Sequence, residues 1–337
     1  MSVKTNSGPI TAQMPVNDIR QAFEQARRVL VASHVDPDGD AIGTQLAFGM
    51  YLTDLGKEVV LTRDSEIPDK YLFLPGVDRI VPANTVSQNV TVDTALILEC
   101  PTILRIGSAA RFLNEGVVVL NIDHHQDNAG FGSVNWIDRR MSSVGEMAYE
   151  YFRSVGYRLK PETAEQLYTA ILTDTGRFRF TSTSPRTFEI AGELVAAGAN
   201  PRKVCDLVYF NMQPSSMKLI GKVLNGIEFH QNGRICMLTL TKQMLVEAGA
   251  AESETDGLVD YTMFSKGVMA GLLAREIDAT HTKVSLRSVD GVDVARIAYL
   301  FGGGGHFNAA GCMVPKPLQE TKTEMIRLLV EANHGMA

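Results

Sequence analysis

The sequence predicts an α/β protein in which a doubly wound, mostly parallel sheet is followed by a smaller α/β domain with a mixed sheet. Three observations support this prediction. Short, continuous apolar runs such as 29–33 and 117–122 are typical of buried parallel strands. Segments with helical spacing of apolar residues separate these runs, and such an alternation predicts βαβ units. From residue 227 onwards the pattern changes to alternating strands around an Asn232-Gly233 turn, which predicts a hairpin and a second domain.

Length and composition fit two globular domains. A chain of 337 residues is long for one domain, and its 45% hydrophobic residues can form two cores. The apolar runs are far shorter than the roughly 20 residues that span a bilayer, and the N-terminus lacks a signal-peptide pattern, so we expect a cytoplasmic protein without a membrane partner. The net charge of −6 argues against binding of long nucleic acid. The four cysteines are widely spaced, which predicts free thiols.

The first domain is expected over 16–198, with strands and helices in alternation. Residues 1–15 are polar and unpatterned, which predicts a mobile tail. The predicted strands cover 29–33, 58–62, 94–98 and 117–122. The predicted helices cover 16–28, 41–55, 143–155, 161–173 and 185–197. Pro201 and Pro214 interrupt helical pieces within 199–225, and we interpret this segment as the linker between the domains.

The second domain is expected over 226–337, with strands at 268–274 and 283–288 and a helix at about 292–300. The run Gly302-Gly303-Gly304-Gly305-His306 follows this helix, and a last strand and helix complete the domain. The run could be only a flexible turn. Alternatively, its glycines let backbone N–H groups approach a phosphate, with His306 adding charge. Arg287 could be a surface cation, but a guanidinium group also binds phosphate in a bidentate way, and its pairing with the glycine run favours phosphate binding.

Several potential metal ligands follow the predicted strands of the first domain. They are His34, Asp36, Asp38 and Asp40 after the first strand, Glu99, the triplet Asp123-His124-His125, and Asp174 after a helix. In open parallel sheets, ligands bind at the carboxyl ends of strands, near the point where the strand order reverses. The first loop alone could be a solvated turn. The combination of carboxylates with imidazoles favours manganese, iron or cobalt, and the ligands suffice for two ions.

These motifs resemble those of the DHH phosphoesterase family, and the likeness extends from about Arg20 over nearly the whole chain. Five segments stand in the family's order: Ser33 to Gly43, Ile97 to Glu99 with Arg105 to Gly107, Asp123-His124-His125, Leu172 to Gly176, and Val284 to Ser288 with Gly302 to Gly311. The last of these resembles the DHH-associated substrate domain. Within the family, the chain is most similar to small bacterial enzymes that degrade very short RNAs and dephosphorylate 3′-phosphoadenosine-5′-phosphate.

The resemblance implies a role for each ligand. One divalent ion would be held by His34, Asp38 and Glu99, and a second by Asp40, Glu99, His124 and Asp174. Manganese is the expected metal, with magnesium, cobalt or iron as alternatives. Asp36 is left out because the family often has Asn at this position. Asp123 would orient the ring of His124, as carboxylates commonly do for metal-bound imidazoles, and His125 would face the substrate phosphate.

Residue 99 departs from the family pattern, in which an Asp bridges the two ions. The additional methylene of Glu99 extends the carboxylate by roughly 1.5 Å. This extension changes the expected spacing and preference of the metals. We expect activity to survive because the other ligands are present, and an inactive nucleotide sensor is the alternative that the substitution suggests.

The resemblance therefore implies a hydrolase of phosphoester bonds whose active site lies in the cleft between two domains. Two metal ions can activate water and stabilise the attacking and leaving oxygens at phosphorus. The implied substrates are short oligoribonucleotides or linear dinucleotides, cleaved to mononucleotides, and 3′-phosphoadenosine-5′-phosphate, converted to AMP. A manganese-dependent inorganic pyrophosphatase is the close alternative, disfavoured by Arg287 and the glycine run. The sequence leaves open whether the chain forms a homodimer.

Two further segments admit two interpretations each. Arg105 could contact the substrate or form a structural salt bridge. Beyond Asp174, Arg177 and Arg179 flank Phe178 and Phe180. These four residues could stack a base or merely lead a helix into an edge strand, and the second interpretation is favoured.

Overall fold

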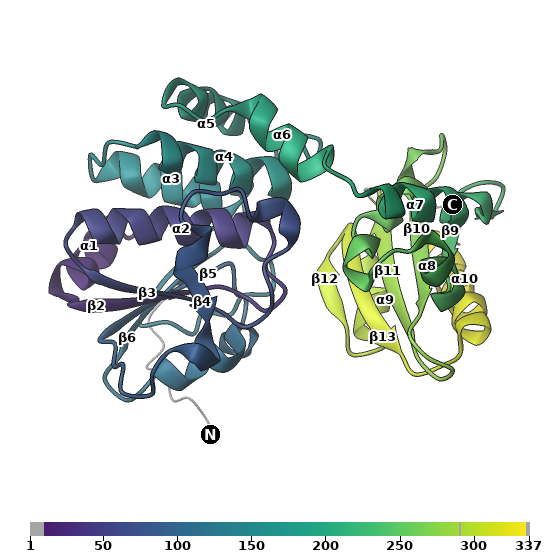
Figure 1. Cartoon of the computed structure of the whole chain (residues 1–337), viewed down its shortest axis with the longest axis horizontal. Helices are drawn as coiled ribbons and strands as arrows, with labels where there is room; N and C mark the ends of the chain where they lie inside the picture. Colours follow the sequence, from purple (N-terminus) through teal and green to yellow (C-terminus); the bar gives the residue numbers. More distant parts are fainter. Residues whose placement is uncertain (1–9, 290, 335–337) are drawn as a thin grey trace. The chain divides into compact units, whose positions relative to one another are not determined.

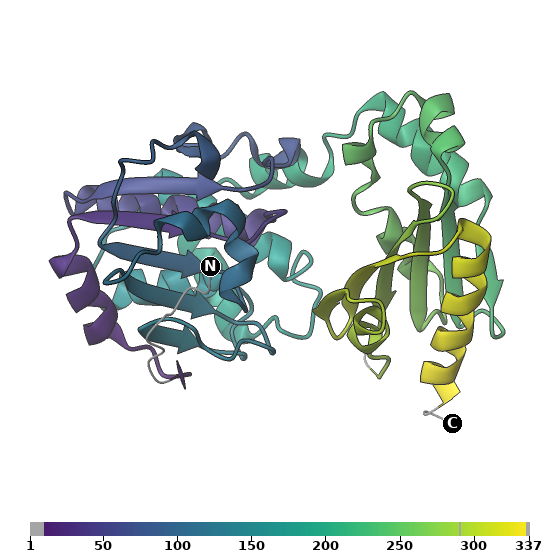
Figure 2. The same ribbon diagram turned by 90° about the horizontal axis from the view of Figure 1, so that it is seen from below.

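The computed structural model describes residues 10–289 and 291–334, which divide into two compact units between Asn211 and Met212. Figures 1 and 2 show the two units, each with its own sheet. The segment predicted as a linker forms two helices, α6 (Pro201–Tyr209) in the first unit and α7 (Pro214–Asn225) in the second. Both helices begin at a proline, whose missing N–H would have no partner in the first turn anyway. Among the described helices, none is long and apolar enough to cross a membrane.

The first unit contains a seven-stranded sheet in the order β1-β7-β6-β5-β2-β3-β4, in which all neighbours are parallel. Its strands are β1 (Ile10–Thr11), β2 (Arg28–Ala32), β3 (Glu58–Arg63), β4 (Ile80–Pro82), β5 (Thr94–Leu98), β6 (Val118–Asp123) and β7 (Val134–Ile137). The chain builds outward from β2 through β3 and β4, and then returns to place β5 on the other side of β2. The strand order therefore reverses between β2 and β5, which confirms the predicted doubly wound fold.

The N-terminal segment differs in part from the prediction of a mobile tail over 1–15. Ile10 and Thr11 pair with Asn135 and Trp136 of β7 at the edge of the sheet. A strand of two residues is too short to show a period in the sequence, which is why it was not predicted. Residues 1–9 lie outside the described residues.

Helices cover the sheet of the first unit in layers. They are α1 (Val16–Gln25), α2 (Gly39–Asp54), α3 (Val144–Ser154), α4 (Pro161–Asp174), α5 (Pro185–Ala196) and α6. Figure 1 shows α2, α3 and α4 over one face of the sheet, with α5 and α6 beyond α4. A second hydrophobic core forms where strand residues such as Leu30 and Ile97 pack with Ile106 and Phe112 of the 3₁₀ segment η4 (Ile103–Phe112).

Three glycines allow the helices above the carboxyl edge of the sheet to pack closely. A Cβ atom on Gly43 would lie 2.4 Å from the backbone oxygen of Gln166, and one on Gly39 would lie 2.4 Å from Oγ1 of Thr173. A Cβ atom on Gly145 would lie 2.6 Å from the side chain of Ala170. These approaches are shorter than any van der Waals contact, so larger residues would push α2 and α3 away from α4. The close packing brings the ends of the three helices to one place.

The second unit contains a six-stranded mixed sheet in the order β12-β13-β11-β10-β9-β8, in which β9 and β10 are parallel and the other neighbours antiparallel. Its strands are β8 (Glu228–His230), β9 (Ile235–Leu240), β10 (Ala270–Glu276), β11 (Thr282–Ser288), β12 (Gly304–His306) and β13 (Ala309–Val314). Its helices are α7, α8 (Lys242–Ala248), α9 (Val294–Tyr299) and α10 (Leu318–His334). The predicted hairpin at Asn232-Gly233 is present and joins β8 to β9. The mixed sheet confirms the predicted fold of this domain.

Candidate metal centre at the carboxyl edge of the first sheet

The carboxyl edge of the first sheet gathers potential ligands from four elements. Asp40 lies in the first turn of α2, Glu99 follows β5, His124 and His125 follow β6, and Asp174 ends α4. The side chains form two groups, and within each group the ligand atoms all lie within 4.8 Å of one another. The first group is Glu99, His124 and His125, and the second is Asp40, His124 and Asp174. His124 belongs to both groups. The structure thus brings together five residues that were predicted for the site.

His34 and Asp38 do not belong to these two groups. Nε2 of His34 lies 3.9 Å from Oδ1 of Asp38. Asp38 caps helix α2, since its Oδ1 accepts a hydrogen bond from the N–H of Ala41 at 2.9 Å, and its side chain is 51% exposed. In the described part of the chain, no group within 4.8 Å joins these two residues to Glu99. A metal ion held by His34, Asp38 and Glu99 therefore stays a prediction.

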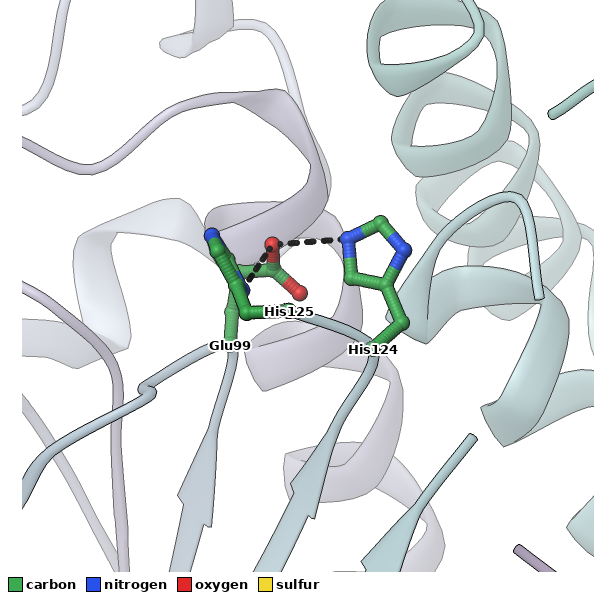
Figure 3. Close-up of side chains that lie close together, drawn as sticks. All are labelled: Glu99, His124 and His125. Carbon is green, nitrogen blue, oxygen red and sulfur yellow. Dashed lines mark hydrogen bonds and ion pairs between the residues drawn. The ribbon is translucent and has the colours of Figure 1, made fainter. Parts of the chain in front are cut away.

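Glu99 occupies a strained and buried position at the centre of the site. Its φ of 58° is left-handed, a conformation that costs a non-glycine residue about 1 kcal/mol or more and is common at functional sites. Figure 3 shows the Glu99 carboxylate between the two imidazole rings, with Oε1 at 3.1 Å from Nε2 of His124 and 3.5 Å from Nδ1 of His125. Oε2 is buried without a hydrogen-bond partner among the described residues. Burial raises the pKa of Glu99 well above its ordinary value, and nearby Asp40 adds to this, although His124 opposes it.

The ring of His124 is oriented by the backbone. Its Nδ1 lies 3.1 Å from the carbonyl oxygen of Met141, and because a carbonyl only accepts, Nδ1 carries the proton of this hydrogen bond. Nε2 is thereby directed at Glu99 and at Oδ2 of Asp174, 3.4 Å away. Burial lowers the pKa of His124, but Glu99, Asp174 and Asp40 together raise it well above the ordinary value. Asp123 accepts a hydrogen bond from the backbone N–H of His124, and its predicted role in orienting this ring stays a prediction.

Asp123 holds the ring of His125. Its Oδ1 accepts a hydrogen bond from Nδ1 of His125 at 2.8 Å and from the backbone N–H of His124 at 2.9 Å. Burial raises the pKa of Asp123, yet the hydrogen bonds from His125 and Asn128 outweigh this and hold the pKa below its ordinary value. Since Nδ1 of His125 is engaged with Asp123, a phosphate would be contacted through Nε2.

Asn128 is a site residue that the sequence analysis missed. Its Nδ2 lies 2.5 Å from Oδ2 of Asp123, 2.9 Å from Oδ1 of Asn121 and 3.0 Å from the carbonyl oxygen of Cys100. Its own Oδ1 accepts a hydrogen bond from the N–H of Gly130 at 2.8 Å. An asparagine in a polar loop is read as a turn residue from sequence. Only the folded chain shows that it supports Asp123 and, through it, His125.

We expect Asn128→Ala to lower kcat by roughly tenfold, as is typical when a residue that orients a site histidine is removed. The free energy of unfolding should fall by about 1–3 kcal/mol, because the substitution leaves buried acceptors without a donor. Steady-state kinetics and urea unfolding would measure the two effects. Asn114, which is exposed, provides a matched Asn→Ala control that should change neither quantity. An unchanged kcat in Asn128→Ala would show that His125 does not depend on this support.

Asp40 and Asp174 complete the acidic part of the site. Asp40 is fully buried, and its carboxylate accepts hydrogen bonds from the N–H groups of Val144 and Gly145 at the start of α3, at 2.6 and 2.8 Å. Burial raises the pKa of Asp40. Burial also raises the pKa of Asp174 to about 8, with Asp40 and Asp38 adding to the effect and His124 opposing it. Carboxylates buried this close together favour a bound cation, because they repel one another when ionised.

The residues present fit a metal ion. Carboxylate oxygens surround an imidazole nitrogen whose ring is fixed from its other side, and one buried oxygen of Glu99 has no hydrogen-bond partner in the described residues. This mixture of donors suits manganese, cobalt, iron or magnesium better than calcium, which prefers oxygen alone. The arrangement can therefore concentrate positive charge at a point where an anionic substrate could bind.

Two predicted substrate-binding arginines have different surroundings. Arg105 is exposed, and within residues 10–289 and 291–334 its side chain forms no ion pair, which leaves the salt-bridge interpretation without support. Arg287 on β11 forms an ion pair with Asp260, with Nε at 2.8 Å from Oδ1, and its Nη1 donates to the carbonyl oxygen of Leu286. Part of the guanidinium group of Arg287 is thus already engaged within its own unit.

The glycine run is not the flexible turn that was one of its two interpretations from the sequence. Gly302 has a φ of 69°, its N–H donates to Tyr299, and the N–H of Gly303 donates to Ala298, which together end helix α9 in a Schellman motif. Gly304 and Gly305 lie in strand β12, opposite Gly311 and Ala310 of β13. A Cβ atom on Gly303 would lie 2.2 Å from the oxygen of Gly311. Close packing therefore requires glycine here, and phosphate binding by Gly303, Gly304, Gly305 and the exposed His306 stays a prediction.

Both units match family models. Residues 28–171 match the N-terminal domain of the DHH family, and residues 233–333 match the DHHA1 domain. The chain is 33% identical over 291 residues to the bifunctional oligoribonuclease and PAP phosphatase NrnA of Thermus thermophilus, a match that covers 84% of this chain and 83% of that protein. It is 28% identical to the protein of the same name from Bacillus subtilis, over 85% of this chain and 89% of that one.

A solved structure has the same fold. The crystal structure of an exopolyphosphatase-related protein from Bacteroides fragilis matches with a TM-score of 0.88 and 26% sequence identity. The match covers 94% of this chain and 95% of that chain. Together with the strand order, it confirms the α/β fold that the sequence predicted.

Proposed function

The chain belongs to the DHH family of phosphoesterases, which are hydrolases of phosphoester bonds, and on this basis we propose that it hydrolyses short oligoribonucleotides to mononucleotides and also dephosphorylates 3′-phosphoadenosine-5′-phosphate to AMP. The observation that supports the proposal most directly is the cluster of buried Asp40, buried Glu99 and half-buried Asp174 around His124. The two relatives named as oligoribonuclease and PAP phosphatase provide the substrate class. Two divalent ions, with manganese as the first choice, and a cytoplasmic location are parts of the same proposal.

The residues of the site would divide the work of hydrolysis. Asp40, Glu99, His124 and Asp174 would hold the metal. When bound, the ion would neutralise charge on the phosphate and lower the pKa of a water molecule. As water adds to phosphorus, the bond to the leaving oxygen breaks, and that oxygen needs a proton. His125 can supply it from Nε2, because Asp123 keeps Nδ1 engaged and the ring in place.

The surroundings of the site suit an anionic substrate despite the net charge of −6. Arg105 follows β5 near Glu99 in sequence, while Arg177 and Arg179 follow Asp174. All three are exposed, and none of them has an ion-pair partner in the part of the chain that the structure describes, while the guanidinium group of Arg177 lies over the ring of Tyr209. Guanidinium groups without an ion-pair partner near an acidic metal centre could attract phosphates that the carboxylates alone would repel.

A parallel assay would test the proposed function. The purified protein with manganese is incubated separately with 5′-phosphorylated di- to pentanucleotides, 3′-phosphoadenosine-5′-phosphate and pyrophosphate. We expect release of mononucleotides and of phosphate from the first two substrates and little from pyrophosphate. Hydrolysis of pyrophosphate alone would favour the pyrophosphatase alternative. Binding of nucleotides without turnover in the presence of manganese, magnesium, cobalt or iron would favour the sensor alternative.

Glu99→Asp should change the metal dependence of the reaction. The shorter side chain withdraws the carboxylate by roughly 1.5 Å from a position where Oε1 now lies 3.1 Å from Nε2 of His124. We expect the manganese concentration for half-maximal activity to shift by about tenfold or more. Activation curves with manganese, magnesium and cobalt would measure the shift, and the exposed Glu115 provides a Glu→Asp control. Identical curves for Glu99→Asp and wild type would show that the longer side chain does not tune the site.

A further inference from the structure

The turn that follows Asp174 has an unusual backbone. Gly176, Arg177 and Phe178 have φ angles of 56°, 66° and 62°, so three consecutive residues are left-handed. Two of them are not glycine, and each left-handed non-glycine residue costs about 1 kcal/mol or more. No edge strand forms at this point, which corrects the interpretation favoured from the sequence. Strain of this kind persists only where the surrounding structure holds it, and it is frequent at ligand-binding sites.

The turn is held by several specific contacts. Oγ1 of Thr175 accepts a hydrogen bond from the N–H of Phe178 at 3.0 Å, and the N–H of Arg177 donates to the carbonyl oxygen of Leu172 at 2.9 Å. The ring of Phe178 stacks on Phe188 of α5 at a centroid distance of 5.1 Å. These contacts fix the backbone of the turn and account for the side chain of Phe178.

Phe180 is the second aromatic residue of this segment, and unlike Phe178 it does not stack on another ring among the described residues. Its side chain is 45% exposed. Its N–H donates to the carbonyl oxygen of Thr175 at 3.0 Å, and a Cβ atom on Gly176 would lie 2.6 Å from its Cζ. The ring therefore lies against the backbone of Gly176, two residues beyond Asp174. A fixed aromatic ring that remains partly exposed to water can gain free energy by stacking with a second planar group.

We propose that Phe180 is a stacking platform for a nucleobase of the substrate whose phosphate is bound at the Asp174 and His124 site. The proposal rests on the proposed function, because it requires a nucleotide at that site. Arg179, which is exposed, would contact the phosphates of the same nucleotide, whereas the guanidinium group of Arg177 lies over the ring of Tyr209 at 4.8 Å. Stacking on an aromatic ring does not depend on the identity of the base, since every base has a planar face. The platform would therefore recognise the presence of a base without selecting its sequence.

A pair of substrates tests the platform. Steady-state kinetics are measured with a 5′-phosphorylated dinucleotide and with two analogues of it. One analogue lacks the base of the first nucleotide, and the other lacks the base of the second. We expect Phe180→Leu to raise KM for the complete dinucleotide about tenfold, which corresponds to roughly 1.4 kcal/mol. With the analogue that lacks the stacked base, the same variant should behave like wild type. Phe180→Tyr should retain the KM of wild type for both substrates.

Fluorescence provides a second measurement that does not require turnover. The probe is the 5′-monophosphate of 2-aminopurine riboside, whose emission is quenched when the base stacks. We expect quenching by wild type, by Phe180→Tyr and by Phe210→Leu, and its loss with Phe180→Leu. Phe210 is a suitable control because it is 77% exposed, belongs to the same unit and lies at the end of α6.

The outcomes separate this proposal from the proposed function. If wild type hydrolyses none of the nucleotide substrates, the proposed function fails, and the platform fails with it. Suppose instead that wild type is active and that Phe180→Leu leaves KM for the complete dinucleotide unchanged, or raises KM equally for it and for both analogues. Only the platform is then refuted. Quenching that is equal in Phe180→Leu and wild type would also refute it.

Discussion

His124→Ala should lower kcat/KM for short oligoribonucleotides by about 10³-fold or more, equivalent to roughly 4 kcal/mol of transition-state stabilisation. His124 is the one residue shared by both potential ligand groups among the described residues. Its Nε2 faces Glu99 and Asp174, and its Nδ1 is tied to the Met141 carbonyl. The methyl group of alanine cannot replace this nitrogen, so we expect the metal to be lost and the carboxylates around it to lose their cation.

Two measurements distinguish loss of metal from loss of folding. Isothermal titration with manganese should show binding to wild type and strongly weakened binding to His124→Ala. Circular dichroism should show that both proteins are folded at the assay temperature. His281 lies on an exposed turn beside Asp278 in the second unit, and His281→Ala should retain both activity and metal binding. Wild-type affinity for manganese in His124→Ala would contradict the assignment of this residue as a ligand.

Asp174→Asn should lower kcat/KM by about 10²-fold or more and, at the same time, stabilise the metal-free protein. The loss of activity follows from removing one ligand charge. The gain in stability follows because an ionised carboxylate at this position lies close to Asp40 in a buried site. Replacing such a poorly compensated charge with a neutral group of the same shape should stabilise the metal-free fold by about 1–3 kcal/mol at pH 8.

The pH dependence of this gain has a definite sign. The pKa of Asp174 is 3.8 in its ordinary state and about 8 in the folded protein. Between these values the folded protein holds one more proton than the unfolded chain, so its stability falls as the pH rises through this window. Asparagine does not titrate, and the difference in stability between Asp174→Asn and wild type should therefore grow from pH 4 to pH 8.

Urea unfolding of both proteins after treatment with a chelator, at several pH values, would measure this difference. Comparison of the two proteins cancels the contributions of groups that do not interact with Asp174, while the titrations of His124 and Asp40, which are coupled to Asp174, remain part of the difference. Adding manganese should reverse the order, because only wild type then gains the free energy of metal binding. A stability difference that is constant with pH would contradict the raised pKa of Asp174 in the folded protein.

The ligand types and their approximate positions could be predicted because they depend on local patterns. Apolar runs that end in a carboxylate or a histidine identify the carboxyl ends of strands, and in a parallel sheet these ends share one edge. The positions of Glu99 and His124 follow from this rule, whereas Asp40 lies in the first turn of α2 and Asp174 at the end of α4. The role of Asp123 does not follow from the rule, because residues 123, 124 and 125 are neighbours in sequence, and only their χ angles decide which ring meets which acceptor.

The same distinction applies to the glycines. Four glycines in succession could indicate a flexible turn, yet Gly302 ends a helix and Gly305 lies in a strand against β13. The need for glycine at these positions arises from backbone that is distant in sequence, such as Gly311 near Gly303. Asn128 was missed for a similar reason, since its partners Asp123, Asn121 and Cys100 meet only when β5 and β6 are paired.

By itself, the sequence determined the α/β fold and the chemical kind of the site, because hydrophobic period and ligand type are properties of short segments. Only the tertiary structure decided that Met141 orients His124, that Asp123 holds His125 and that Phe180 lies over Gly176. These are contacts between atoms a few ångströms apart, which depend on how helices and strands pack and on the rotamers that this packing permits.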